Sequence, residues 1–352
     1  MTPAPPLSRT QLWLFYAFGI VTIGAALLAF KTNTTFILAI PALILVILFS
    51  ILDYRSIYFL LLAMLPCSIE YYFPSGLATD LPTEPLMVGL MLVTFGLVFF
   101  RYSLLPIGFL SHPLWLLLML HLFWIFICAL NSGMPVFSFK VFLAKIWYIL
   151  PFTVLTGIVI RKGDDLKKLI WCIGVPLTIL IFISVMRHGI IYKFGFQEVN
   201  KSVTPYFRNH VNYAAMMSIF FPFLILALYW YERGTAMRRW IVGVIVFYII
   251  AVYLSYTRTA MLAIVGMIPF YYIIKWRVLR LSLVSLIVVA TIGLGWLFYD
   301  NHYLRFAPEF ETTIYHDDFS THVSSTFEGK DVSSMERVYR WVAAVRMSKD
   351  RP

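Results

Sequence analysis

Two arginines that stand beside apolar runs are the side chains of this sequence best suited to chemistry. Arg258 lies in the stretch Tyr253–Leu262 (YLSYTRTAML), between the apolar runs 240–253 and 260–272. So short a polar break leaves the guanidinium at the edge of a membrane or inside a cavity, where an unpaired charge is costly. We therefore expect Arg258 to have an anionic partner.

A second stretch, Tyr206–Tyr213, places Arg208 beside two amides and an imidazole, directly before another apolar run. The amides and the imidazole belong to Asn209, Asn212 and His210. A helix that begins here offers an anion its free N–H groups and its dipole, and a guanidinium can bind two phosphate oxygens at once. A simpler interpretation stays open, in which the asparagines only cap the helix and the histidine satisfies a neighbour.

The composition places these arginines in a membrane protein. Of 352 residues, 61% are hydrophobic and 13% are charged, whereas about 25% of residues are charged in a soluble domain. Apolar runs of about 17 to 22 residues recur along the chain, and each is long enough to cross about 30 Å of hydrocarbon. We predict an all-α, polytopic integral membrane protein, with no nucleic acid among its partners, because the net charge of +11 comes from loops.

The apolar runs predict about eleven transmembrane helices and a topology. The predicted spans are 12–30, 33–52, 57–73, 85–100, 113–130, 141–160, 169–186, 211–231, 240–257, 259–274 and 281–299. With a cytoplasmic N-terminus, each loop after an even-numbered span carries at least one Lys or Arg, and the later ones carry several, which fits the positive-inside rule. The loop from Glu70 to Glu84 has three acids and neither Lys nor Arg, which fits the outer side. Residues 1–299 would form the membrane domain and residues 300–352 an outer loop.

This topology leaves several basic residues on the outer side, against the rule: Lys140, Lys145, Arg187, Lys193, Lys201, Arg208 and Arg258. Some of them could simply contact lipid. Arg208 and Arg258, however, would repel each other in a shared cavity unless a multivalent anion were bound. A lipid-linked diphosphate is the natural candidate, and Lys140 and Lys145 could add positive charge.

The outer loop ends in a predicted amphipathic helix. Ser333–Glu336 is a capping box, and Val338, Trp341, Val342 and Val345 follow near helical spacing. Three histidines, His302, His316 and His322, precede this helix, and we expect them to be ordinary loop histidines. Cys67, Cys128 and Cys172 show no metal-ligand spacing, so we expect neither a metal site nor a cofactor.

Four segments, taken in order, resemble the superfamily of O-antigen ligases and O-antigen polymerases, which are glycosyltransferases of the bacterial inner membrane. They are Phe137–Lys145, Arg208 with its amides, the turn Leu254–Ala260 (LSYTRTA), and Arg337–Ala344 (RVYRWVAA). The turn is the most specific of the four, because it follows the superfamily pattern S-x-(S/T)-R-(G/T)-A.

The resemblance implies metal-independent transfer of a glycan from undecaprenyl diphosphate on the periplasmic face. Arg258 and Arg208 would hold the leaving diphosphate, with contributions from His210, Asn212, Lys145 and Lys140. A histidine would take the proton of the acceptor hydroxyl. In the superfamily this histidine belongs to a His-Asn pair that follows the last helix named above, so we expect it, and a further span, to lie beyond Pro352.

The acceptor and the class of protein leave alternatives. A ligase transfers to lipid A–core, a polymerase to another lipid-linked repeat, and a relative could glycosylate proteins; we favour the ligase. A transporter or flippase would carry charges within its spans and often internal repeats. The centres of these spans are almost free of charge, which favours catalysis at an interface. A structural scaffold would give no reason for two outer arginines.

Overall fold

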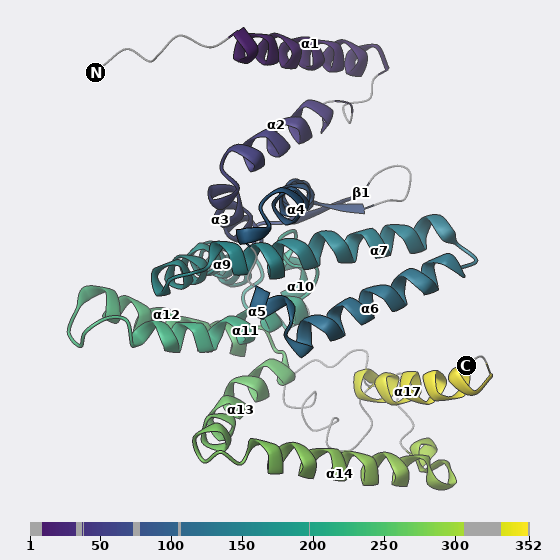
Figure 1. Ribbon diagram of the computed structural model, residues 1–352. Helices are drawn as coiled ribbons and strands as arrows, with labels where there is room; N and C mark the ends of the chain where they lie inside the picture. The colour runs from purple at the N-terminus through teal and green to yellow at the C-terminus, as the bar shows by residue number, and fades with distance from the viewer. Residues whose placement is uncertain are drawn as a thin grey trace. The chain divides into compact units, whose positions relative to one another are not determined.

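The computed structural model describes residues 9–32, 37, 39–72, 78–104, 107–196, 198–305 and 332–350 (Figure 1). The chain divides into two compact units, Met1–Leu177 and Thr178–Pro352. Within the described ranges the regular secondary structure is helical except for one two-stranded hairpin. The all-α fold class is therefore confirmed.

The first unit contains the N-terminal helices and the hairpin. Its elements are α1 (Arg9–Thr32), α2 (Ala39–Leu52), α3 (Tyr54–Met64), β1 (Ile69–Tyr72), β2 (Ala78–Leu81), α4 (Thr83–Phe100), η2 (Tyr102–Leu104), α5 (Ile107–Leu110), α6 (Pro113–Leu130), α7 (Pro135–Ile149), the π-helical turn η3 (Leu150–Leu155) and α8 (Thr156–Val159). The helix α9 (Gly163–Ile190) begins in this unit and ends in the second.

The second unit carries both arginine stretches. Its further elements are α10 (Val199–Val203), α11 (His210–Leu228), α12 (Ala236–Leu254), α13 (Arg258–Lys275), α14 (Leu279–Phe298), η4 (Tyr299–Arg305) and α17 (Val332–Asp350). The predicted amphipathic helix is thus present as α17, which begins one residue before Ser333. It buries Met335 and Val342, whereas Trp341 and Val345 are exposed.

Each predicted span corresponds to an apolar helix. Among the described residues, eight helices are long and apolar enough to cross a membrane, and the apolar stretches Tyr16–Thr32, Pro41–Leu52 and Tyr54–Met64 are shorter. The predicted span 113–130 coincides with α6 at both ends. The helices α6 and α7 run side by side (Figure 1), with Phe126 packed against Phe139 and Phe142.

The prediction of a span over 57–73 is wrong in its second half. The helix α3 ends at Met64, and Ile69–Tyr72 forms β1, which pairs antiparallel with β2. This hairpin places Glu70 opposite Asp80. Burial, and then the nearby carboxylates Glu84 and Glu70, raise the pKa of the Asp80 carboxyl. Ile69, Tyr71 and Tyr72 are β-branched or aromatic and favour a strand, and Glu70 interrupts the apolar run; the run-length criterion weighed neither.

The core of the first unit lies where α3, α4 and η3 meet. Tyr58, Leu61, Leu90 and Leu155 are almost completely buried there. The Tyr58 hydroxyl lies 2.7 Å from the Thr156 hydroxyl, so its polar end is satisfied inside the cluster. The chain can bend at η3 because Pro151, which has no N–H to donate, stands at its start.

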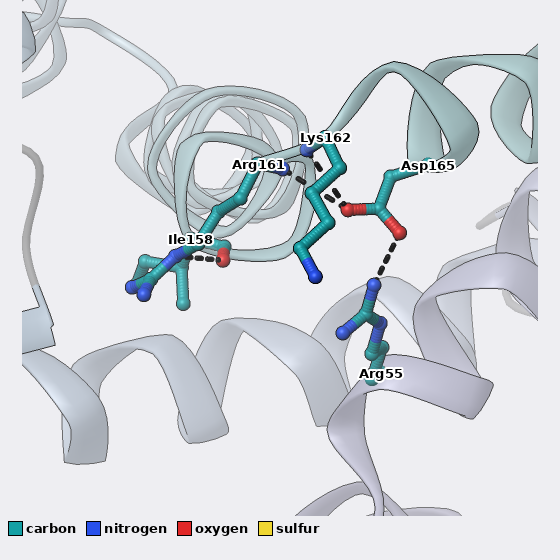
Figure 2. A network of polar contacts seen from close by, with 5 residues as sticks. All are labelled: Arg55, Ile158, Arg161, Lys162 and Asp165. Atoms are coloured by element: carbon teal, nitrogen blue, oxygen red, sulfur yellow. Dashed lines mark hydrogen bonds and ion pairs between the residues drawn. The ribbon is translucent and has the colours of Figure 1, made fainter.

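A polar network at the start of α9 fixes the entry of this helix (Figure 2). Asp165 accepts from the backbone N–H groups of Arg161 and Lys162 at 3.2 and 3.1 Å, and also pairs with Arg55. The Asp165 side chain is 7% exposed, whereas that of Arg55 is 53% exposed. Arg161 in turn donates from Nε to the Ile158 carbonyl at 3.1 Å. One carboxylate therefore satisfies two backbone donors and one guanidinium.

This asymmetry predicts unequal losses of stability. Asp165→Ala leaves two backbone donors without their acceptor, so it should lower the thermal unfolding temperature more than Arg55→Ala, which removes only a half-exposed ion pair. Asp165→Asn keeps one oxygen acceptor and should fall between them. Thermal unfolding of the purified variants in detergent measures the order. Equal losses for Asp165→Ala and Arg55→Ala would show that the ion pair, and not the backbone acceptor, is the main contribution.

Candidate functional site

The turn between α12 and α13 consists of three residues, Ser255, Tyr256 and Thr257. Ser255 is completely buried, and its hydroxyl donates to the Val252 carbonyl at 2.6 Å. Tyr256 adopts a φ of 53°, in the left-handed region, which reverses the chain in so few residues. The helix α13 then begins at Arg258, so this arginine stands in the first turn, where backbone N–H groups have no helical partner.

Thr257 links this turn to the second arginine stretch. Its hydroxyl lies 3.2 Å from the Ser255 carbonyl oxygen and 3.5 Å from that of His210, the first residue of α11. The Ser218 hydroxyl of α11 lies 3.4 Å from the Ala260 carbonyl oxygen of α13. The starts of α11 and α13 are therefore in contact.

Asn209 and Asn212 have different environments at the start of α11. The side chain of Asn209 caps the helix by accepting from the backbone N–H of Asn212 at 2.8 Å. For Asn209, then, the simpler interpretation of a helix cap is supported. The Asn212 side chain is exposed and makes no hydrogen bond with the residues that the structure describes.

Asn200 determines the tautomer of His210. The Asn200 Oδ1 accepts from the backbone N–H of His210 at 2.9 Å and lies 2.8 Å from its Nδ1. A backbone N–H can only donate, so this Asn200 atom is an oxygen, and the Nδ1 beside it must carry a proton. The Nε2 of His210 is then the ring atom left for another partner. No local motif pairs these residues, because ten positions separate them in the sequence.

Tyr256 and a second histidine, His188, connect the turn to the segment that follows α9. The Tyr256 hydroxyl donates to the Phe194 carbonyl at 3.0 Å, and its ring packs on Phe196 and His188. His188 is 3% exposed and contacts the Gly195 carbonyl through Nε2 at 3.0 Å. Burial raises the pKa of the Tyr256 phenol, which keeps it a donor at neutral pH. The motif pattern treats position 256 as variable, so its role could not be inferred from the motif.

The two arginines differ in environment. Arg258 is half-buried, while Arg208 is exposed and makes no hydrogen bond or ion pair within the described part of the chain. Two other basic residues that the topology predicts on the outer side have structural roles instead. Arg187 donates to the carbonyls of Thr204 and Lys201, and Lys201 pairs with Glu198 at 2.7 Å.

The remaining predicted site residues, Lys140 and Lys145, lie on α7 in the first unit. Lys140 donates to the Ala78 carbonyl of β2 at 3.2 Å, and Lys145 is exposed. Five residues separate them, which turns their side chains about 140° apart around the helix. Whether either lysine contributes charge to the arginine site stays a prediction.

Of the three loop histidines, the structure describes one. The His302 Nδ1 lies 3.0 Å from the Trp296 carbonyl oxygen, and its ring stacks on that of Trp296 at 4.9 Å. His302 thus packs against the end of α14, and His316 and His322 lie outside the described residues. Within those residues, no group of three or more His, Cys, Asp or Glu side chains could hold a metal ion.

One segment of the chain matches a known protein family. Residues 243–352 match a family model described as "O-Antigen ligase", and this segment includes the Arg258 turn and α17. No curated protein and no solved structure matches the chain. Its apolar helices and this match together indicate a multi-pass bacterial membrane protein. The match over residues 243–352 supports the resemblance to the superfamily of O-antigen ligases and polymerases.

Proposed function

We propose that this protein transfers a glycan from undecaprenyl diphosphate to an acceptor hydroxyl at the periplasmic face of the inner membrane. The observation that carries the proposal is the contact between Thr257 and His210. It joins two helix starts, each with an arginine at or just before its first residue. Helix N-termini and guanidinium groups both favour a phosphate-bearing ligand.

The proposed reaction needs charge stabilisation at the leaving group. The acceptor oxygen forms a bond to the anomeric carbon of the donor glycan, and the bond from that carbon to the diphosphate oxygen breaks. The diphosphate leaves with the electron pair, so its negative charge grows. Arg258 and Arg208 would stabilise that charge through paired N–H donors. The acceptor proton passes to a general base, for which the resemblance implies a histidine.

His210 suits a supporting role in this site. Its Nδ1–H is engaged by Asn200, so the ring is oriented and Nε2 is the atom that can meet the ligand. With the proton on Nδ1, the neutral ring offers Nε2 only as an acceptor. If the ring takes up a second proton beside the diphosphate, Nε2 would donate to a phosphate oxygen and add one charge-assisted hydrogen bond to those of the arginines. Asn212, whose side chain is exposed in the first turn of α11, would donate from its amide.

The acceptor we propose is lipid A–core, which makes the protein a ligase. The alternative acceptor is a second lipid-linked repeat, which would make it a polymerase. The surface glycans of a deletion strain distinguish the two. Loss of all long chains with polymer left on the carrier indicates a ligase, and caps of a single repeat indicate a polymerase.

Arg258→Lys should abolish most glycan transfer while leaving membrane insertion intact. Lysine keeps the charge but loses the two parallel N–H donors, and the loss of one such donor at a developing anion costs about 10²-fold in rate. Complementation of a deletion strain, with membrane abundance measured alongside, tests this. The matched control is Arg277→Lys, because Arg277 is exposed and follows the opposite end of α13.

The pair Arg208→Lys and Arg258→Lys tests whether one anion contacts both arginines. If both bind the same diphosphate, the double variant should lose less than the product of the two single losses. Strictly multiplicative losses would assign the arginines to separate ligands. Near-normal transfer by Arg258→Lys alone would remove the diphosphate hypothesis.

Asn209→Ala should lower the stability of the protein, whereas Asn212→Ala should lower its transfer activity. Loss of the Asn209 cap should destabilise α11 by about 1 kcal/mol and lower the thermal unfolding temperature. Asn212→Ala leaves the capping hydrogen bond in place, so it should lower transfer with little change in unfolding. Unfolding in detergent and the transfer assay measure the two effects. Unchanged transfer in Asn212→Ala would exclude its amide from the site.

A further inference from the structure

An apolar groove lies between α9 and α12, in the second unit, away from the arginine turn. Its volume is about 790 Å³, and it is lined by Thr178, Ile179, Phe182, Ala236, Arg239, Trp240, Gly243, Val244 and Phe247. Volumes of roughly 300–1,000 Å³ are typical of ligand pockets. Arg239 is the one charged residue in this lining.

The α12 side of the groove is a single helical stripe. Ala236, Trp240, Gly243 and Phe247 recur at intervals of three and four, and Arg239 stands in the same stripe within the first turn. The distance from residue 236 to residue 247 along the axis is about 16 Å, roughly half of the 30 Å hydrocarbon layer. The groove therefore has the length of one leaflet, with its charged end where α12 begins.

Two neighbouring arginines at this end differ in their contacts. Arg238 donates from Nη1 to the carbonyls of Leu228 and Tyr231 at 2.8 and 3.0 Å, so it caps the end of α11. Arg239 is exposed, and its guanidinium has no hydrogen bond or ion pair with the residues that the structure describes. Trp240, beside it, is 73% exposed, as is usual for a tryptophan at a membrane interface.

We propose that this groove binds an anionic phospholipid, with an acyl chain along α12 and the phosphate on Arg239. Charge complementarity selects the head group, because a basic side chain at the mouth of a groove between membrane helices attracts anionic lipid. The length of the groove matches the thickness of one leaflet, which fits the acyl chain of a phospholipid in that leaflet. Since Arg239 and Arg258 flank opposite ends of α12, this lipid lies in the leaflet opposite to the proposed diphosphate site.

Fluorescence quenching of Trp240 tests the occupant. The full chain is reconstituted in phosphatidylcholine vesicles that contain brominated phosphatidylglycerol or, in parallel, brominated phosphatidylcholine at the same mole fraction. The difference from Trp240→Phe isolates the signal of this residue. We expect about a fivefold preference for phosphatidylglycerol, the effect of one basic side chain near an anionic lipid.

Three variants locate the preference. Arg239→Gln should remove it, while Arg233→Gln, a change in the exposed loop before α12 and outside the groove lining, should keep it. Gly243→Leu should lower quenching by both lipids, because Gly243 lines the groove and a Cβ there would meet open space, so the added side chain would occupy groove volume.

Four results would overturn the proposal. They are equal quenching of the wild-type protein by the two lipids, an equal loss of preference in Arg233→Gln and Arg239→Gln, and unchanged quenching in Gly243→Leu. The fourth is relief of the quenching by unbrominated undecaprenyl phosphate more strongly than by unbrominated phosphatidylglycerol. That result would assign the groove to the polyprenyl carrier instead.

Discussion

A chain inside a bilayer must satisfy its backbone hydrogen bonds without water, and this constraint explains which polar side chains are available for function. Each break between helices leaves carbonyl groups that need donors. Arg187 supplies two donors for the end of α10, and Arg238 supplies them for the end of α11. Arg208 and Arg239 serve no such carbonyl among the described residues. Arg208 and Arg239 are therefore better candidates for ligand binding than the arginines that already donate to backbone carbonyls.

The same constraint explains how the arginine turn can be so short. The hydroxyls of Ser255 and Thr257 donate to nearby carbonyl oxygens, and the Tyr256 hydroxyl donates to the Phe194 carbonyl. These polar groups of the turn therefore need no hydrogen bond from solvent. The motif residues around Arg258 are thus largely structural. They hold the first turn of α13 against the first turn of α11. The proposed diphosphate would lie there at the N-termini of both helices.

Run length and hydrophobicity predicted the helices well, because a span must be long and apolar whatever surrounds it. The same criterion failed at β1, where the strand preference of Ile and Tyr and the charge of Glu70 mattered more than hydrophobicity. Asn209 could be predicted as a cap, since capping is local. The contacts of Thr257 with His210 and of Asn200 with His210 could not, because they depend on how helices pack. The sequence predicted several basic residues on one side of the membrane, but it could not show that Arg187 already donates to backbone carbonyls whereas Arg208 does not among the described residues.

The length of α12 has a consequence for how this protein can vary. This 19-residue helix carries Arg239 in its first turn and leads directly into the turn that precedes Arg258. One inserted residue would rotate everything beyond it by about 100° and shift it by about 1.5 Å. Arg258 would then leave its place beside α11 even though the motif itself were unchanged. The number of residues in α12 thus sets both the distance and the rotation between its start and Arg258. The site depends on that number as much as on the identity of the arginine.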